Sequence, residues 1–172
     1  MIKSPLILTL SIEKEASLFF NTLRQKHFPP SRNFIDAHLT LFHALPNEDS
    51  IVDVVNDACK LQNPFEISVE KPVSIGKGVA YKIESNELVQ LHKKLQNKWL
   101  EFLTLQDRQK LWPHITVQNK VPLLNAQELL NELKEGFTPF AALAIGLQLW
   151  EYLNGPWKLV EDFIFKNVEA LE

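Results

Sequence analysis

Apolar residues alternate with polar ones, or run together, in seven segments of the chain. Both patterns are typical of strands, because side chains two positions apart share one face of a strand. We therefore predict strands over residues 6–12, 37–45, 65–75, 79–84, 114–121, 139–152 and 157–165. The turn residues Gly76-Lys77-Gly78 and Asn154-Gly155-Pro156 predict that two pairs of consecutive strands form hairpins.

Apolar residues recur at helical spacing in four other segments. This spacing predicts helices over residues 13–25, 49–61, 86–103 and 126–134. The third helix is the longest, and its apolar side carries Leu88, Leu91, Leu95, Trp99 and Phe102. The combination of helices with strand hairpins predicts the α+β fold class.

The two halves of the chain repeat one order of elements. Each half contains a strand that carries a histidine, then a helix, then a hairpin. These elements cover residues 38–45, 49–61 and 65–84 in the first half, and 114–121, 126–134 and 139–165 in the second. Such an order indicates a degenerate internal repeat. No linker separates the halves, so we predict a single domain over residues 1–172, made of two pseudo-symmetric lobes packed side by side.

The two histidine-bearing strands share a short motif. The first reads His38-Leu39-Thr40-Leu41 and the second His114-Ile115-Thr116-Val117, so both have the form His–apolar–Thr–apolar. Alternation along a strand places the histidine and the threonine of each motif on one face and the two apolar residues on the other. Each strand is therefore expected to anchor its apolar face in the core and to present an imidazole and a hydroxyl.

This pairing suits the cleavage of a phosphodiester. The reaction needs one group that removes a proton from the nucleophile and another that delivers a proton to the leaving oxygen, and imidazole can do either near neutral pH. Threonine hydroxyls can donate hydrogen bonds to the non-bridging phosphate oxygens. We therefore predict that His38, Thr40, His114 and Thr116 are catalytic, and that the reaction requires no metal and no other cofactor.

Charge and composition limit the kinds of partner that the chain is expected to bind. The formal net charge is −3, whereas proteins that coat long nucleic acids usually carry a strong positive excess. We therefore expect a small nucleotide or an RNA terminus as substrate and no long nucleic-acid footprint. No apolar stretch reaches the roughly 18 residues that a membrane span needs, and Glu13 interrupts the apolar run near the N-terminus. We expect neither a signal peptide nor contact with a membrane.

Cys59 is the single cysteine of the chain, which excludes an internal disulfide and a cysteine-based zinc cluster. A lone cysteine is compatible with a reducing compartment, and we expect a cytoplasmic monomer.

The paired motifs in a duplicated α/β chain of this length resemble the two-histidine phosphoesterase superfamily. Within it, the chain is most similar to the bacterial 2′-5′ RNA ligase and cyclic phosphodiesterase group. Pro113, directly before the second motif, also fits this family. The resemblance covers nearly the whole chain and implies two βαβ-type lobes with antiparallel sheets around a central cleft, with one motif strand of each lobe on the cleft floor.

The resemblance also implies roles for the motif residues. His38 and His114 would be the catalytic pair, and Thr40 and Thr116 would hold the phosphate. The family acts without metal on 2′,3′-cyclic phosphates, on ADP-ribose cyclic phosphates or on 2′-5′ linkages. Since its members differ in the loops over the cleft, the resemblance does not carry over a particular substrate.

Six further residues are candidates for substrate binding. They lie near the motifs in sequence or on the neighbouring hairpin: Arg32, Tyr81, Lys82, Trp112, Gln118 and Lys120. Gln118 and Lys120 continue the alternation of His114 and Thr116 along the strand. For each candidate, an exposed charge or simple core packing is the alternative. His43 lies five positions after His38, so alternation predicts that it is on the opposite face, as a packing or surface residue.

Three other functions stay open at the level of the sequence. The same cleft could bind a nucleotide or an RNA end without turning it over. A 2′-5′ RNA ligase would use nearly the same site with a hydroxyl in place of water. A metal hydrolase is the third, since Asp36 would point to the same side as His38; such an enzyme would lose activity in a chelator.

Overall fold

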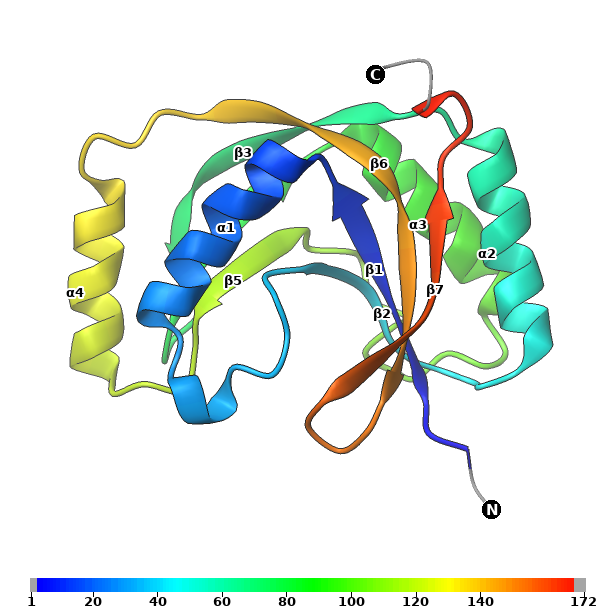
Figure 1. Ribbon diagram of the computed structural model, residues 1–172, viewed down its shortest axis with the longest axis horizontal. Coiled ribbons are helices and arrows are strands. Elements are labelled where there is room, and N and C mark those ends of the chain that lie inside the picture. The colour runs from blue at the N-terminus through cyan, green and yellow to red at the C-terminus, as the bar shows by residue number, and fades with distance from the viewer. Residues whose placement is uncertain (1–2, 169–172) are drawn as a thin grey trace.

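The computed structural model describes residues 3–168 of the chain (Figure 1). Residues 1–2 and 169–172 of the predicted domain lie outside the described residues. The elements follow in the order β1 (Leu6–Ile12), α1 (Lys14–His27), a 3-10 helix η1 (Pro30–Arg32), β2 (Leu39–Leu45), α2 (Asp49–Leu61), β3 (Phe65–Ser74), β4 (Val79–Glu84), α3 (Asn86–Trp99), β5 (His114–Gln118), α4 (Leu123–Lys134), β6 (Phe140–Tyr152) and β7 (Trp157–Ile164). The predicted order of helices and strands is confirmed.

All strands belong to one antiparallel sheet, in which β2, β1, β6, β3, β4 and β5 are successive neighbours and β7 pairs with β6 beside this path. The predicted α+β class with antiparallel pairing is therefore confirmed. The long β6 crosses the molecule from the α4 side to the α2 side (Figure 1). It pairs with β1 along one edge, and with β3 and then β7 along the other. The sheet is curled, and β2 and β5 at its two ends contact each other.

The two halves of the sequence repeat are interleaved in this sheet. The hairpin of β3 and β4 follows β2 in the chain but pairs with β5. The hairpin of β6 and β7 follows β5 in the chain but pairs with β1, the neighbour of β2. The strand β5 therefore pairs directly with a hairpin from the other half of the chain, and β2 is connected to one through β1.

Helices cover the two ends of the sheet. The helix α1 packs on β5, α4 on β3 and β4, and α2 on β6 and β7. The helix α3 packs on β2, where Phe42 contacts the rings of His92 and Trp99. Each fully buried large apolar side chain of this core contributes about 1.5–3 kcal/mol to stability. None of the helices within residues 3–168 is both long enough and apolar enough to cross a membrane.

The helix α3 is shorter than predicted. The side-chain oxygen of Ser85 caps its first turn by accepting a hydrogen bond from the backbone N–H of Leu88. The helix ends at Trp99, although the sequence predicted a helix up to residue 103, and Phe102 is half exposed instead of buried on the apolar side. The chain then folds back in turns. These turns carry Asp107 to β2, where it contributes to the site described below.

Candidate active site

The two motifs lie at the two ends of the curled sheet, where β2 and β5 meet. His38 directly precedes β2, so this strand begins two residues later than predicted, and His114 is the first residue of β5. The apolar motif residues are almost fully buried, whereas both histidines and both threonines are half-buried; the buried set is Leu39, Leu41, Ile115 and Val117. The predicted alternation of the two faces within each motif is therefore present.

Both imidazole rings are oriented in the same way by the backbone. The Nδ1 of His38 lies 2.8 Å from the carbonyl oxygen of Asp36, and the Nδ1 of His114 lies 2.8 Å from the carbonyl oxygen of Trp112. A carbonyl oxygen can only accept, so each Nδ1 carries the hydrogen in the neutral ring. The Nε2 atom of each ring then has a free lone pair, which is the state that a general base needs.

An indole ring accompanies each histidine. Trp112 stacks on His114, with 4.2 Å between the ring centroids and 25° between the ring planes. Trp157 lies against His38, at a centroid distance of 4.7 Å and an angle of 50°. The prediction placed Trp112 near the site, whereas Trp157 was missed, because it lies far along the sequence and reaches His38 only through the pairing of β7 with β6.

Burial lowers the pKa of both rings. The pKa of His38 falls to about 4 mainly through burial; the hydrogen bond to Asp36 opposes the shift, and electrostatic interactions with Arg24 and with the imidazoles of His114 and His43 add to it. Burial also lowers the pKa of His114, against the hydrogen bond to Trp112 and together with the electrostatic interaction with His43. Both rings are therefore neutral near pH 7.

Arg24 is a buried cation that connects the two motifs, and the sequence analysis missed it. Its side chain is 5% exposed. Its Nε–H donates to Asn33 Oδ1 and its Nη1–H to the carbonyl oxygen of Thr116, both at 2.9 Å. Arg24 therefore ties the loop before His38 to the strand of the second motif. The available signal was helical spacing, since Arg24 follows the buried Phe20 by four positions on α1.

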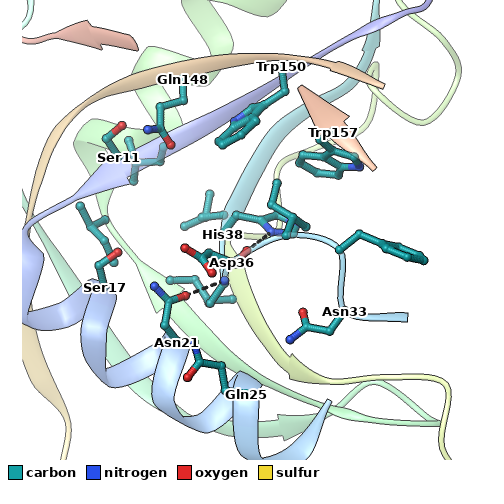
Figure 2. Close-up of a pocket in the computed structure, with 17 residues that line it drawn as sticks. Ser11, Ser17, Asn21, Gln25, Asn33, Asp36, His38, Gln148, Trp150 and Trp157 are labelled. Carbon is teal, nitrogen blue, oxygen red and sulfur yellow. Dashed lines mark hydrogen bonds between the residues drawn. The ribbon is translucent and has the colours of Figure 1, made fainter. Parts of the chain in front are cut away.

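A cavity of about 650 Å³ opens beside His38. Its walls come from α1, the end of β1, the loop before β2, and the strands β6 and β7 (Figure 2). Among the predicted catalytic residues, His38 lines this cavity, whereas Thr40, His114 and Thr116 do not. Ile115 of the second motif also contributes to the wall, so the cavity reaches from one motif to the other.

Residues 12–156, which include both motifs, match the protein family described as the 2′-5′ RNA ligase superfamily. The chain belongs to the 2′-5′ RNA ligase superfamily. The predicted resemblance to two-histidine phosphoesterases is therefore confirmed. No functionally curated protein shows significant sequence similarity to the chain.

Solved structures share the fold of this 2′-5′ RNA ligase superfamily member. TT0787 of Thermus thermophilus has 16% sequence identity and a TM-score of 0.66, over 94% of this chain and 98% of that chain. A structure described as a phosphoesterase has 16% identity and a TM-score of 0.61, over 95% and 98%. E. coli LigT in complex with 3′-AMP has 14% identity and a TM-score of 0.60, over 95% and 98%.

Both motif strands of this superfamily member contain a one-residue bulge directly after the motif threonine. In β2, Thr40 pairs with Thr9 but Phe42 pairs with Leu8, so Leu41 is the extra residue. In β5, Thr116 pairs with Ala80 but Gln118 pairs with Val79, so Val117 is the extra residue. A bulge shifts the alternation by one position. Side chains beyond it therefore lie on the face opposite to the one that regular alternation predicts; those affected are Phe42, His43 and Gln118.

The bulge in β2 corrects the prediction for His43. This residue lies on the same face as His38 instead of the opposite one, and its electrostatic interaction with both motif histidines contributes to lowering their pKa. The side chain of His43 is 47% exposed, and its Nδ1 lies 3.0 Å from the buried carboxylate of Asp107. The same carboxylate accepts the backbone N–H groups of His43 and Ala44 at 2.9–3.0 Å. Asp107 therefore holds both the irregular strand and the His43 ring.

Burial alone would raise the pKa of Asp107, but the hydrogen bonds from the His43 side chain and from the two N–H groups outweigh this effect and lower the pKa. The carboxylate is therefore charged near neutral pH. Asp107 was missed because nothing in the sequence connects it with a strand that lies more than sixty positions earlier.

Two of the six flanking predictions, Tyr81 and Gln118, are corrected by the structure. Tyr81 is 1% exposed and packs in the core against Phe20 and Phe137, so it does not line the site. Gln118 turns into the protein behind the bulge and is buried. Lys120 is exposed and has a φ of 61°, in the segment that follows β5, which ends at Gln118 instead of at residue 121; its contact with a substrate stays a prediction.

The remaining three flanking candidates lie outside the buried core. Lys82 lies directly opposite His114 on β4 and forms an ion pair with Glu84. Trp112 contacts His114 as described above. Arg32 is an exposed residue of η1, in the connection from α1 to His38. No three His, Cys, Asp or Glu side chains within residues 3–168 are grouped as a metal site requires.

Proposed function

We propose that the chain is a phosphodiesterase that needs no metal and acts on nucleotide or RNA-terminal phosphodiesters, with a 2′,3′-cyclic phosphate or a 2′-5′ linkage as substrate. One observation carries this proposal: His38 and His114 each have Nδ1 fixed to a backbone carbonyl, and they lie at the starts of β2 and β5, the strands that meet at the ends of the sheet. Two imidazoles prepared in the same way fit the two proton transfers of the reaction.

In the proposed mechanism, the phosphate lies between the two histidines. For a cyclic phosphate, one Nε2 accepts a proton from the attacking water while the water oxygen forms a bond to phosphorus. The other ring, protonated, donates its Nε2 proton to the ribose oxygen whose bond to phosphorus breaks, and a nucleoside monophosphate results. The hydroxyls of Thr40 and Thr116 donate hydrogen bonds to the non-bridging oxygens.

The electrostatics of the site are compatible with one histidine acting as the base and the other as the acid. Burial lowers the pKa of both rings and so keeps them neutral near pH 7, which leaves a base available. A phosphate group that enters the site brings a negative charge, and a negative charge raises the pKa of a neighbouring imidazole. The substrate itself would thereby favour the protonated ring that acts as the acid.

We also propose a partner, an oligomeric state and a cellular location. A small nucleotide or an RNA terminus is the expected partner, and the crystal structure of E. coli LigT with 3′-AMP shows that a protein of this fold can hold a nucleotide. We further propose that the protein acts as a monomer in a reducing compartment such as the cytoplasm, which its single buried cysteine, Cys59, favours.

The test is hydrolysis of nucleoside 2′,3′-cyclic phosphates with EDTA present throughout. We expect turnover by the natural protein and none by the His38→Ala/His114→Ala double variant. His27→Asn is the control, because it removes an imidazole at the end of α1 whose neighbouring charges are Lys26 and Glu132, not residues of either motif. Circular dichroism and thermal unfolding of each variant would establish that the fold is retained.

The other outcomes separate the remaining functions. Full activity in the double variant would refute the two-histidine mechanism. Activity that EDTA removes and added metal restores would favour a metal hydrolase. Tight nucleotide binding in calorimetry without any product would favour a binding module, and joining of RNA ends by a 2′-5′ bond would show that a hydroxyl replaces water as the nucleophile.

A further inference from the structure

The cavity beside His38 has the size of a small-molecule site. Its volume of about 650 Å³ lies within the range of about 300–1,000 Å³ that is typical of ligand pockets. Because His38 forms part of its wall, a substrate whose phosphate contacts this ring would extend its neighbouring group into the cavity (Figure 2). The lining residues therefore indicate which chemical group this is.

The cavity is not suited to a second phosphate. No lysine or arginine lines it, and the only carboxylate in the lining belongs to Asp36. Phosphates in proteins are usually held by cationic side chains or by helix N-termini. The group bound here is therefore expected to be uncharged.

One wall of the cavity is aromatic. Trp157 lies against His38, and the ring of Trp150 follows at a centroid distance of 6.2 Å (Figure 2). The Nε1–H of Trp150 donates to Thr9 Oγ1 at 2.9 Å, which fixes the orientation of this indole. A fixed aromatic surface next to a phosphate site offers a platform on which a nucleobase can stack.

The opposite wall is polar, and its hydrogen-bonding direction is determined. Asn21 Oδ1 accepts the backbone N–H of Ala37 at 2.8 Å (Figure 2), and Asn33 Oδ1 accepts the Nε–H of Arg24 at 2.9 Å. An amide nitrogen could not accept these hydrogens, so the assignment of oxygen and nitrogen is fixed in both residues. Each of these two asparagines is left with an NH₂ group that can only donate.

We propose that this cavity binds the nucleobase of the substrate, with the base against the Trp157 and Trp150 rings and with the NH₂ groups of Asn21 and Asn33 donating to acceptor atoms of the base. This inference rests on the proposed function for the position of the phosphate. It adds the substrate class: a nucleotide with its base is preferred over a cyclic phosphate without a base, and over one that carries a second phosphate in place of the base.

The chain offers an isosteric variant that isolates the donor. Asn21→Asp retains an oxygen that accepts the N–H of Ala37, and it replaces only the NH₂ group. Asn131→Asp is the matched control, because it adds the same charge on the exposed side of α4, away from the cavity. Trp157→Leu removes the aromatic surface next to His38 and serves as a second, independent variant.

The experiment compares two substrates, a nucleoside 2′,3′-cyclic phosphate and methyl riboside 2,3-cyclic phosphate, which has the same reactive group but no base. We expect kcat/KM of the natural protein to be at least about tenfold higher for the nucleotide, in line with the strength of base stacking. This preference should fall severalfold in Asn21→Asp and in Trp157→Leu, and it should stay unchanged in Asn131→Asp. The ratio of the two substrates cancels the effect of the added charge on the phosphate itself.

Equal kcat/KM values for the two substrates would overturn the base site while leaving the proposed function intact. An equal loss for both substrates in Asn21→Asp and Trp157→Leu would also overturn it, since these residues would then only position His38. Calorimetry with a nucleoside 2′-monophosphate and with methyl riboside 2-phosphate tests the cavity without turnover. Preferential binding of the nucleotide in a protein without activity would support the base site and refute the enzymatic function; equal binding would refute the base site.

Discussion

Replacing His38 by glutamine is expected to remove a pH-dependent part of the stability of the protein. Burial lowers the pKa of His38 from 6.5 to about 4. Between these two values, the unfolded chain binds a proton at this position and the folded protein does not. The free energy of unfolding of the natural protein therefore falls as the pH decreases from about 6.5 toward 4, whereas above pH 7 the ring is neutral in both states.

The size of this effect follows from the difference between the two pKa values. A difference of about 2.5 pH units corresponds to about 3.4 kcal/mol when the pH lies below both values, and to about 2 kcal/mol at about pH 5. His38 is only half-buried and lies at an open cavity, so water screens part of this effect. We therefore expect about 1 kcal/mol at about pH 5.

Urea unfolding of the natural protein and of His38→Gln at about pH 7.5 and about pH 5 measures this contribution. Burial also lowers the pKa of His27, His92 and His114, so both proteins lose stability in acid, but these losses cancel in the comparison. The natural protein should lose about 1 kcal/mol more than the variant between the two pH values. An equal loss, or a larger loss in the variant, would refute the reasoning that burial holds His38 neutral.

Three further predictions concern the support of the site. Arg24→Met should lower the free energy of unfolding in urea by about 2–4 kcal/mol, because it removes two charge-assisted hydrogen bonds between the motifs; an unchanged midpoint would contradict this. Asp107→Asn should cost about 1–3 kcal/mol in the same assay, since an amide replaces one acceptor for the N–H groups of β2, whereas a neutral effect would argue against its role. Gly78→Ala should cost more than about 3 kcal/mol, because the new Cβ would lie 2.0 Å from a backbone oxygen of β5. Thermal unfolding should show a loss of only about 1–2 kcal/mol for the control Gly76→Ala, where a φ of 83° is the only obstacle.

The sequence predicted the elements of the fold well where the pattern was regular. The spacing of apolar residues indicated the order of helices and strands, and the repeated motif identified the two histidines that the fold brings to the adjoining ends of one sheet. The spacing of apolar residues within one element reflects which side of that element is buried. It can therefore be interpreted without knowing the elements against which it packs.

The errors at His43 and Gln118 share one physical cause. The prediction assumed that side chains continue to alternate regularly beyond Thr40 and Thr116. A bulge follows each of these threonines, so His43 and Gln118 lie on the opposite faces from those predicted. The adjacent apolar residues Leu41 and Phe42, both buried, were the available sign of such an irregularity. Tyr81 was misplaced because a tyrosine fits both a core and a cleft.

Residues that act through distant contacts could not be found from spacing alone. Arg24 meets Thr116, and Trp157 meets His38, across more than ninety positions of the chain. Contacts of this kind depend on which strands pair, and the interleaving of the two hairpins was not visible in the order of the elements.

The interleaved hairpins also have a consequence for how the protein reaches its native state. The pairing of β1 with β6 joins residues that are more than a hundred positions apart, so the contact order of the sheet is high and folding is expected to be slow. On the ribosome, the first motif strand and its neighbour β1 must wait for β6 to be synthesised before the sheet can close around them. The sheet should therefore become complete only in chains that have been synthesised through β6, and a fragment that contains one complete motif should not fold by itself.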